Sequence, residues 1–224
     1  MIEVVDLWKE YKIGEGVVPA LAGINFTVGQ GEFVGILGNS GSGKSTLIHL
    51  IAGFTRPTRG QVRVGGNSIF EFSDRKISSY RNRELGFVFQ AFHLLPEMTA
   101  LENVMLPLSA SRLPYKKRVK MATKALEEVE LSHRFSHKPF QLSGGQMQRV
   151  SIARAMVNQP RILIADEPTG NLDSSSSSEI MDIFADLNRV EGNTVIVVTH
   201  EPDVAGYADR IITFKDGCIT GRKD

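Results

Sequence analysis

The amino-acid sequence predicts an α/β fold, on observations from three parts of the chain. Residues 33–37 are a short apolar run, followed by a glycine-rich loop and then by apolar residues at helical spacing. Residues 161–167 and 194–198 are further apolar runs, and a helical pattern lies between them. Residues 91–150 instead have a mostly helical character. We therefore expect a single domain in which a parallel sheet and its helices are interrupted by a helical insert.

The size and composition are those of an ordinary globular protein. The chain has 224 residues, of which 42% are hydrophobic and 23% charged, enough for one large domain with a proper core. A formal net charge of +1 argues against a broad basic surface, so we expect no nucleic-acid partner. The one cysteine, Cys218, excludes an internal disulfide and is expected to be a packed, inert thiol in a reducing compartment.

Two further observations bear on where the protein acts. No apolar run approaches the length that crosses a bilayer. Residues 1–6 lack the basic and apolar regions of a signal peptide. We therefore expect a cytoplasmic protein that acts at a membrane only through a partner.

The glycine-rich loop matches the phosphate-loop pattern G-x-x-x-x-G-K-[ST]. It consists of Gly38, Asn39, Ser40, Gly41, Ser42, Gly43, Lys44, Ser45 and Thr46. Its glycines let successive N–H groups point into one concavity, and the dipole of the following helix, residues 44–52 with Gly53 as its cap, adds positive potential. We expect Lys44 to reach the β- and γ-phosphates and the Ser45 hydroxyl to bind Mg²⁺. The loop predicts a nucleoside triphosphate site.

The remaining elements follow from periodicity and turn residues. We expect strands over residues 2–8, 23–28, 60–64, 86–89, 210–214 and 218–220, and helices over residues 101–108 and 115–131, with a short helix after Gly145. Strand 60–64 is expected at a sheet edge and strand 194–198 at a centre. Asp173 can cap a helix; the serine run 174–178 would suit a linker, but the pattern that follows favours the first helical turns. Residues 216–217 predict a hairpin.

Polar residues close three of the expected strands. Asp166 and Glu167 end one apolar run, where Asp166 is expected to support Mg²⁺ through its water shell and Glu167 to polarise the attacking water. His200 ends another on the same edge of a parallel sheet, where ligands gather in open α/β folds. Gln90 follows a third, and its amide could reach the metal or the water.

Two stretches leave alternatives open. Tyr11, upstream of the phosphate loop, either stacks on a base or is a half-buried loop tyrosine, and its position alone does not decide. The expected helix 115–131 has a basic face, for which a solvated surface is favoured over an anionic partner: Lys116, Lys117, Arg118, Lys120 and Lys124.

A second anion site is indicated by Leu142, Ser143, Gly144, Gly145 and Gln146, which offer a hydroxyl and bare backbone amides at a helix start. This stretch is identical to the signature motif of the ATP-binding cassette (ABC) family, and over its whole length the chain resembles the nucleotide-binding subunit of an ABC transporter. The resemblance implies a P-loop NTPase with a RecA-like core, an antiparallel β subdomain and an α-helical subdomain. The core with the β subdomain would comprise residues 1–90 and 151–224, and the helical subdomain residues 91–150.

The resemblance also implies roles for single residues. It assigns Tyr11 to adenine stacking, Gln90 to the Q-loop, Asp166 and Glu167 to the Walker B acid and the catalytic base, Asp173 to the D-loop and His200 to the switch histidine. Two copies would pack head-to-tail, so that Ser143 and Gly145 of one contact the γ-phosphate on the Lys44 of the other. ATP binding would close this homodimer, and hydrolysis would open it.

A narrower resemblance lies in residues 166–173 and 87–96. Both are similar to the lipoprotein-releasing, macrolide-exporter and cell-division ATPases. This similarity implies an integral membrane permease, contacted between Phe92 and Pro96, that holds the protein on the cytoplasmic face of the membrane. His93 stands where many relatives have asparagine, and it lies in that permease-facing segment.

Two other classes of function compete with a transport motor. A soluble ABC-type ATPase of DNA repair would separate its motifs by a long coiled coil, which the sequence between Lys44 and Ser143 is too short to hold. Translation factors of this type usually carry two cassettes, and this chain has one. A P-loop kinase would leave the signature unexplained. We therefore expect an ATPase that drives transport.

Overall fold

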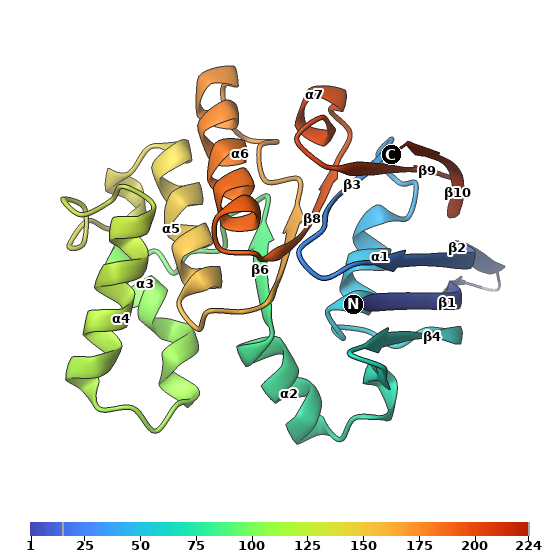
Figure 1. The fold of residues 1–224 in the computed structure, drawn as a ribbon, viewed down its shortest axis with the longest axis horizontal. Coiled ribbons are helices and arrows are strands. Elements are labelled where there is room, and N and C mark those ends of the chain that lie inside the picture. The colour runs from blue at the N-terminus through green and yellow to red at the C-terminus, as the bar shows by residue number, and fades with distance from the viewer. Residues whose placement is uncertain (15, 224) are drawn as a thin grey trace.

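The computed structural model describes residues 1–14 and 16–223, which form two β-sheets and a group of helices (Figure 1). The larger sheet has the strand order β10-β9-β3-β8-β7-β6. Its strands are β3 (Phe33–Gly38), β6 (Leu85–Phe89), β7 (Ile162–Asp166), β8 (Thr194–Thr199), β9 (Arg210–Lys215) and β10 (Cys218–Lys223). All neighbours pair in parallel except β10, which forms an antiparallel hairpin with β9. The predicted α/β fold is confirmed, with β8 in an interior position.

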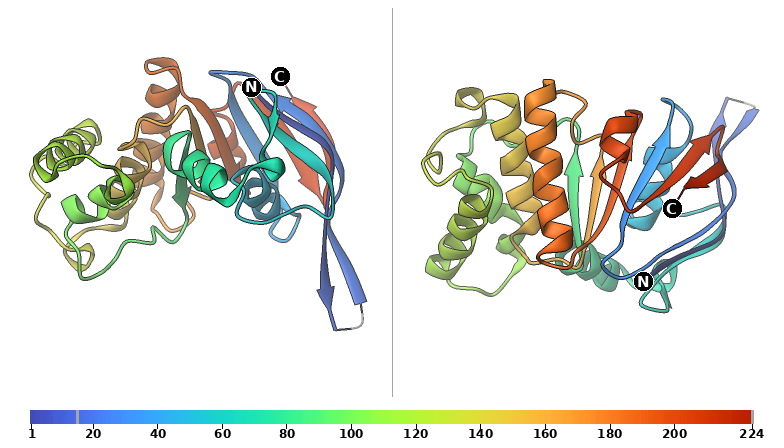
Figure 2. Two further views of the ribbon diagram at one scale, coloured as in Figure 1. Left: turned by 90° about the horizontal axis from the view of Figure 1, so that it is seen from below. Right: turned by 45° about the horizontal axis from the view of Figure 1, so that its top comes forward.

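The smaller sheet is antiparallel and has the order β2-β1-β4-β5. It comprises β1 (Ile2–Ile13), β2 (Gly16–Val28), β4 (Arg59–Val64) and β5 (Asn67–Ser68). Both β1 and β2 are longer than we expect from sequence, and their hairpin projects beyond the rest of the molecule (Figure 2). The expectation of an edge position for residues 60–64 is wrong, because β5 pairs with the outer side of β4.

Helices cover both faces of the large sheet. The helices are α1 (Lys44–Ile51), α2 (Asp74–Arg83), α3 (Ala100–Met105), α4 (Tyr115–Glu128), α5 (Gly144–Met156), α6 (Ser174–Arg189) and α7 (Pro202–Ala205), with 3₁₀ turns at Ile69–Glu71, Leu106–Ala110 and Pro139–Gln141. Helix α1 lies between the two sheets, while α5 and α6 lie side by side on the other face (Figure 2). Helix α5 has 13 residues, so the expectation of a short helix there is wrong. The subdomain boundary that we expect at about residue 150 lies inside α5.

Two hydrophobic cores hold these layers together. One fills the space between the sheets and includes Val4, Phe26, Leu47, Ile51 and Ile164. The other joins α3, α4, α5 and α6 to the opposite face of the large sheet and includes Val88, Leu126, Val150, Leu163 and Phe184. Because successive residues of β7 alternate between the two cores, the strand is buried on both faces, as its continuous apolar run predicts.

Two further observations concern the cysteine and the possibility of a membrane-spanning helix. Cys218 is exposed at the start of the edge strand β10, so the prediction of a packed thiol is wrong. Over residues 1–14 and 16–223, no helix has both the length and the apolar character to cross a membrane.

Candidate nucleotide site

The phosphate loop connects β3 to α1, as its flanking sequence predicts. Gly41 and Gly43 have φ angles of 78° and 102°, which side-chain-bearing residues rarely adopt. A Cβ added to Gly43 would lie 2.4 Å from the carbonyl oxygen of Ala20 on β2, so this position also needs glycine for close packing. The loop is therefore fixed by backbone conformation on one side and by the small sheet on the other.

Lys44 folds back over this loop. Its Nζ donates hydrogen bonds to the carbonyl oxygens of Gly38 at 2.7 Å and Asn39 at 2.8 Å. Burial lowers the pKa of the Lys44 ammonium, an effect that the nearby carboxylates of Glu167 and Asp166 oppose. The cation is thus held at the loop by neutral carbonyls, an arrangement suited to receiving phosphate oxygens.

A hydroxyl and a carboxylate meet beside the loop. Ser45 Oγ donates to Asp166 Oδ1 at 3.1 Å, which joins the start of α1 to the end of β7. Burial raises the pKa of the Asp166 carboxyl, while the hydrogen bond from Ser45 lowers it. Among the described residues no group of three or more His, Cys, Asp and Glu side chains could hold a metal. The sparse pair suits Mg²⁺, which keeps several waters and binds one or two protein oxygens together with substrate phosphates.

Glu167 turns away from the course of β7. Its φ angle is 47°, in the left-handed region, and its N–H donates to the carbonyl of Val198 on β8 at 2.9 Å. This turn brings Glu167 Oε2 to 3.4 Å from His200 Nδ1. The structure therefore brings together two predicted residues from the ends of neighbouring strands.

Gln90 lies beside the segment that follows Glu167. A Cβ added to Gly170 would be 2.6 Å from Gln90 Nε2, and Asn171 Nδ2 donates to the Gln90 carbonyl at 2.9 Å. No hydrogen bond joins the Gln90 side chain to Ser45 or Asp166 within the described residues. The glycine at position 170 is needed for this close approach.

Sequence reasoning missed Gln148, which is fully buried on α5. Its Nε2 donates to the carbonyl of Pro168 at 2.6 Å and to that of Phe89 at 3.4 Å. It thereby ties the helix of the signature to the ends of β6 and β7. Its position two residues beyond the signature, within a helical pattern, is the only signal that the sequence offers.

Tyr11 lies on β1, opposite Val18 of β2, and is 43% exposed. The alternative of a loop tyrosine is therefore wrong. Lys9 Nζ lies 5.0 Å from the centre of the Tyr11 ring. The partner strand β2 meets the phosphate loop at Ala20, two residues beyond the Val18 that pairs with Tyr11.

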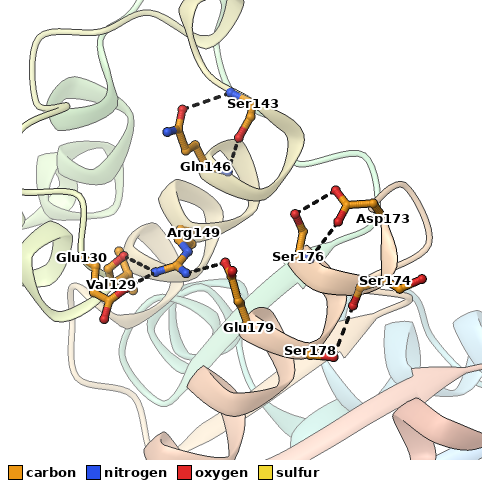
Figure 3. Close-up of polar contacts among 10 residues, drawn as sticks. All are labelled: Val129, Glu130, Ser143, Gln146, Arg149, Asp173, Ser174, Ser176, Ser178 and Glu179. Carbon is orange, nitrogen blue, oxygen red and sulfur yellow. Dashed lines mark hydrogen bonds and ion pairs between the residues drawn. The ribbon is translucent and has the colours of Figure 1, made fainter.

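The signature begins α5 and is built as a helix cap (Figure 3). Ser143 Oγ accepts a hydrogen bond from the Gln146 N–H at 3.3 Å, and Gln146 Oε1 accepts one from the Ser143 N–H at 3.1 Å. Ser143 is exposed, whereas Leu142 is buried. No hydrogen bond or ion pair connects residues 142–146 to residues 38–46 in the described part of the chain.

Asp173 caps α6, as predicted. Its Oδ1 accepts from the Ser176 N–H at 3.0 Å and its Oδ2 from Ser176 Oγ at 2.9 Å. These hydrogen bonds, the backbone one above all, lower the pKa of the Asp173 carboxyl. Ser176 also lies against Gly145, because a Cβ added to Gly145 would be 3.2 Å from Ser176 Oγ. Gly145 and Asp173 of one chain are therefore linked through Ser176.

A comparison with known protein families identifies the family to which the chain belongs. The family described as ABC transporter matches residues 21–170. The chain belongs to the ABC transporter family. It is an ATPase, the ATP-binding and ATP-hydrolysing part of an ABC transporter, which agrees with the fold class and function predicted from sequence. A soluble repair or translation ATPase is not favoured.

Individual relatives extend the comparison. The chain is 51% identical over 221 residues to the macrolide export ATP-binding/permease protein MacB of Chlorobaculum tepidum, covering 98% of this chain and 33% of that protein. It is 48% identical over 219 residues to the lipoprotein-releasing system ATP-binding protein LolD of Geobacter metallireducens, covering 98% and 97%. The chain thus spans a third of the first relative and nearly all of the second.

Solved structures agree with the sequence comparison. The dimeric structure of MJ0796, a bacterial ABC transporter cassette, matches with a TM-score of 0.93 and 44% identity, covering 100% of this chain and 98% of that one. A post-hydrolysis state of MJ0796 bound to ADP and Pi matches with a TM-score of 0.92 and 43% identity over the same shares of the two chains. The fold is that of an ABC cassette.

Proposed function

We propose that two copies of this chain close head-to-tail around two ATP molecules and so drive a membrane permease. The observation that carries the proposal is the separation of the signature from the phosphate loop of its own chain. Ser143 is exposed at a helix start whose N–H groups can bind an anion, and within the described residues no hydrogen bond joins it to the phosphate loop of its own chain. In an isologous dimer, Ser143 and Gly145 would meet the γ-phosphate held by Lys44 of the second copy. The dimeric form of MJ0796 supports this arrangement.

Within each ATP site, different residues of the chain would bind the phosphates, the adenine and Mg²⁺. The backbone of the phosphate loop and Lys44 would bind the phosphates, and Tyr11 would stack on the adenine. Ser45, Asp166 and Gln90 would hold Mg²⁺. When bound, Mg²⁺ neutralises phosphate charge and orients the terminal phosphate for attack.

Glu167 and His200 would act on the attacking water. The carboxylate of Glu167 accepts a proton from the water as general base, and His200, at 3.4 Å, holds that carboxylate in place. Asp173 would lie at the dimer contact, next to the signature that serves the other site. Hydrolysis then removes the γ-phosphate that joins the two copies, and the dimer opens.

The permease would dock beside residues 92–96. Arg154 of α5 donates to the carbonyls of Phe92 and His93, both of which have left-handed φ angles, so this segment is held in a specific shape. Next to it, a cavity of about 380 Å³ is lined by Phe54, Arg81, Phe87, Pro107, Arg154 and Asn158. A cavity lined by two phenylalanines and two arginines suits a short amphipathic segment that carries an acidic residue.

The relatives indicate the kind of transport. MacB is named for macrolide export and LolD for lipoprotein release. We propose that this chain drives export, lipoprotein release or the transmission of motion to an extracytoplasmic domain, and that its permease holds it on the cytoplasmic face of the membrane.

Affinity purification of the tagged chain from detergent-solubilised membranes tests the partner. Recovery of an integral membrane permease with a large extracytoplasmic domain is expected, and recovery only with ribosomes or nucleic acid would overturn the proposal. Phe54→Asp, which places a charge among the aromatic residues of the cavity, should abolish co-purification while ATP binding persists. Val190→Asp is the matched control, since Val190 is an exposed residue at the end of α6.

A further inference from the structure

Arg149, on α5, joins three elements that surround the signature (Figure 3). Its Nη1 donates to the carbonyl of Val129 at 3.1 Å and to Glu130 Oε2 at 2.8 Å, both just beyond α4. Its Nη2 donates to Glu179 Oε2 on α6 at 2.8 Å. The Arg149 side chain is 14% exposed, so the guanidinium is the buried centre of this group while the two carboxylates reach it from the surface.

The contact with Glu179 lies one helical turn below a second contact between α5 and α6. There, Gly145 of the signature packs against Ser176, which in turn binds the carboxylate of Asp173. The two helices therefore meet at two levels: a small-residue contact at their N-terminal ends, and an ion pair one turn on. A planar guanidinium held at two carboxylates and a carbonyl has few alternative orientations, so it fixes the rotation of α5 relative to α6.

In the proposed dimer, the N-terminal ends of these two helices are associated with different ATP molecules. The signature at the start of α5 would serve the ATP of the second copy, while Asp173 at the start of α6 follows Glu167, which serves the ATP of its own chain. Whatever holds α5 against α6 therefore links the two ATP sites.

We propose that Arg149 is a positioning residue that, through Glu179, couples the two ATP sites of the dimer. The inference rests on the proposed head-to-tail dimer. Removing the bond to Glu179 frees α5 to turn relative to α6, so that the signature no longer follows changes at Glu167 and Asp173. The bond to Glu130 stays within the helical part of the chain and is not expected to carry coupling.

This division between the two carboxylates gives a matched pair of variants. Glu179→Met removes the link to α6, and Glu130→Met removes the link to the end of α4; each loses one carboxylate at 2.8 Å from the same guanidinium. We expect Glu179→Met to lower the Hill coefficient of ATP hydrolysis towards one. It should also weaken ATP-driven dimerisation in the Glu167→Gln background by about 5- to 150-fold, the usual range of coupling between sites.

Glu130→Met should leave both quantities as in the unmodified protein, and neither variant should change the affinity of the monomer for a fluorescent ATP analogue. Arg149→Met should reproduce Glu179→Met. Arg210→Met is its control for stability, because Arg210, whose side chain is 17% exposed, forms a 2.7 Å ion pair with Glu32 away from the signature.

A thermal melt of every variant separates coupling from folding. The proposal is overturned if Glu179→Met and Glu130→Met change the Hill coefficient and dimer affinity equally, or if neither changes them. If the Glu167→Gln protein itself forms no ATP-dependent dimer, the head-to-tail proposal fails, and that outcome is seen before any Arg149 variant is compared.

Discussion

His200 Nδ1 lies 3.4 Å from Glu167 Oε2, across the ends of two neighbouring parallel strands. The contact depends on the left-handed turn at Glu167, whose N–H binds the carbonyl of Val198 on the strand that leads to His200. A non-glycine residue in this region is strained, and strain of this kind is found where a side chain must be aimed. The Glu167 side chain is 20% exposed, so it is partly shielded from water and held at one end by the histidine.

Glu167→Gln should abolish turnover while leaving ATP binding intact. The amide keeps the size and hydrogen-bonding reach of the side chain but cannot accept the proton of the attacking water, so ATP-bound dimers should accumulate. Size-exclusion chromatography with and without ATP measures the dimer, and phosphate release measures turnover. If the variant hydrolyses ATP at the normal rate, Glu167 is not the general base.

His200→Ala should lower kcat more than it raises KM. The histidine is placed to orient Glu167 and forms no hydrogen bond or ion pair with the phosphate loop in the described structure, so ATP binding should largely persist. Steady-state kinetics over a range of ATP concentrations separates the two parameters. His133→Ala, at an exposed position after α4, is the control and should leave both unchanged. An equal loss in both variants would remove His200 from the site.

The sequence predicts the phosphate loop from its motif, and the ends of β7 and β8 from continuous apolar runs, because these two strands are buried on both faces. It also predicts the end of β6, although Phe87 and Phe89 of this edge strand are only partly buried. It does not predict which of two adjacent acids turns towards His200, because the left-handed φ of Glu167 is a tertiary feature. Nor does it place Gln148, since a glutamine in a helix shows nothing of the carbonyls it will meet.

The sequence also does not predict helix α2 or the full length of β1. Helix α2 buries only Tyr80, and its composition is dominated by charged and polar residues, so it has no apolar stripe to detect. Ser73, whose side chain caps the helix, is the one signal of this helix in the sequence. In β1, the irregular pairing near Asp6, where φ is 42°, interrupts the alternation that would have carried the strand on to Tyr11.

Asp166→Asn should stabilise the nucleotide-free protein while abolishing Mg²⁺-dependent hydrolysis. Burial raises the pKa of Asp166, so the folded state binds a proton more readily than the unfolded state, and the ionised carboxylate costs stability above its ordinary pKa. The melting temperature of Asp166→Asn should exceed that of the unmodified protein at pH 7. This gain should shrink as the pH falls through the raised pKa to the ordinary value.

Asp173→Asn should change the melting temperature in the opposite direction. Hydrogen bonds to Ser176 lower the pKa of Asp173, so its charge stabilises the fold above the ordinary pKa and that contribution is lost as the pH falls through the lowered value. Asparagine also caps helices, so the hydrogen bond from the Ser176 N–H is kept while the charge and the second acceptor oxygen are lost, and the melting temperature should fall slightly at pH 7. Melting curves of both variants at several pH values test the pair. A gain in Asp173→Asn or a loss in Asp166→Asn would contradict the account.

Ser143→Asp should prevent ATP-driven dimerisation without unfolding the signature helix. Ser143 caps α5 through its hydrogen bond with the Gln146 N–H, so Ser143→Ala would combine the loss of a phosphate contact with about 1 kcal/mol of lost capping. Aspartate and asparagine both cap well, which makes Ser143→Asn the neutral control of the same size. Aspartate alone places a negative charge where the γ-phosphate of the second copy would lie.

Comparing Ser143→Asp with Ser143→Asn therefore isolates the effect of a negative charge at the proposed dimer contact. Both variants should melt at nearly the same temperature as the unmodified protein and bind ATP as monomers with unchanged affinity. In the Glu167→Gln background, Ser143→Asn should still form ATP-dependent dimers, whereas Ser143→Asp should stay monomeric at every ATP concentration. If Ser143→Asp dimerises as well as Ser143→Asn, the signature does not face a phosphate, and the head-to-tail arrangement must be abandoned.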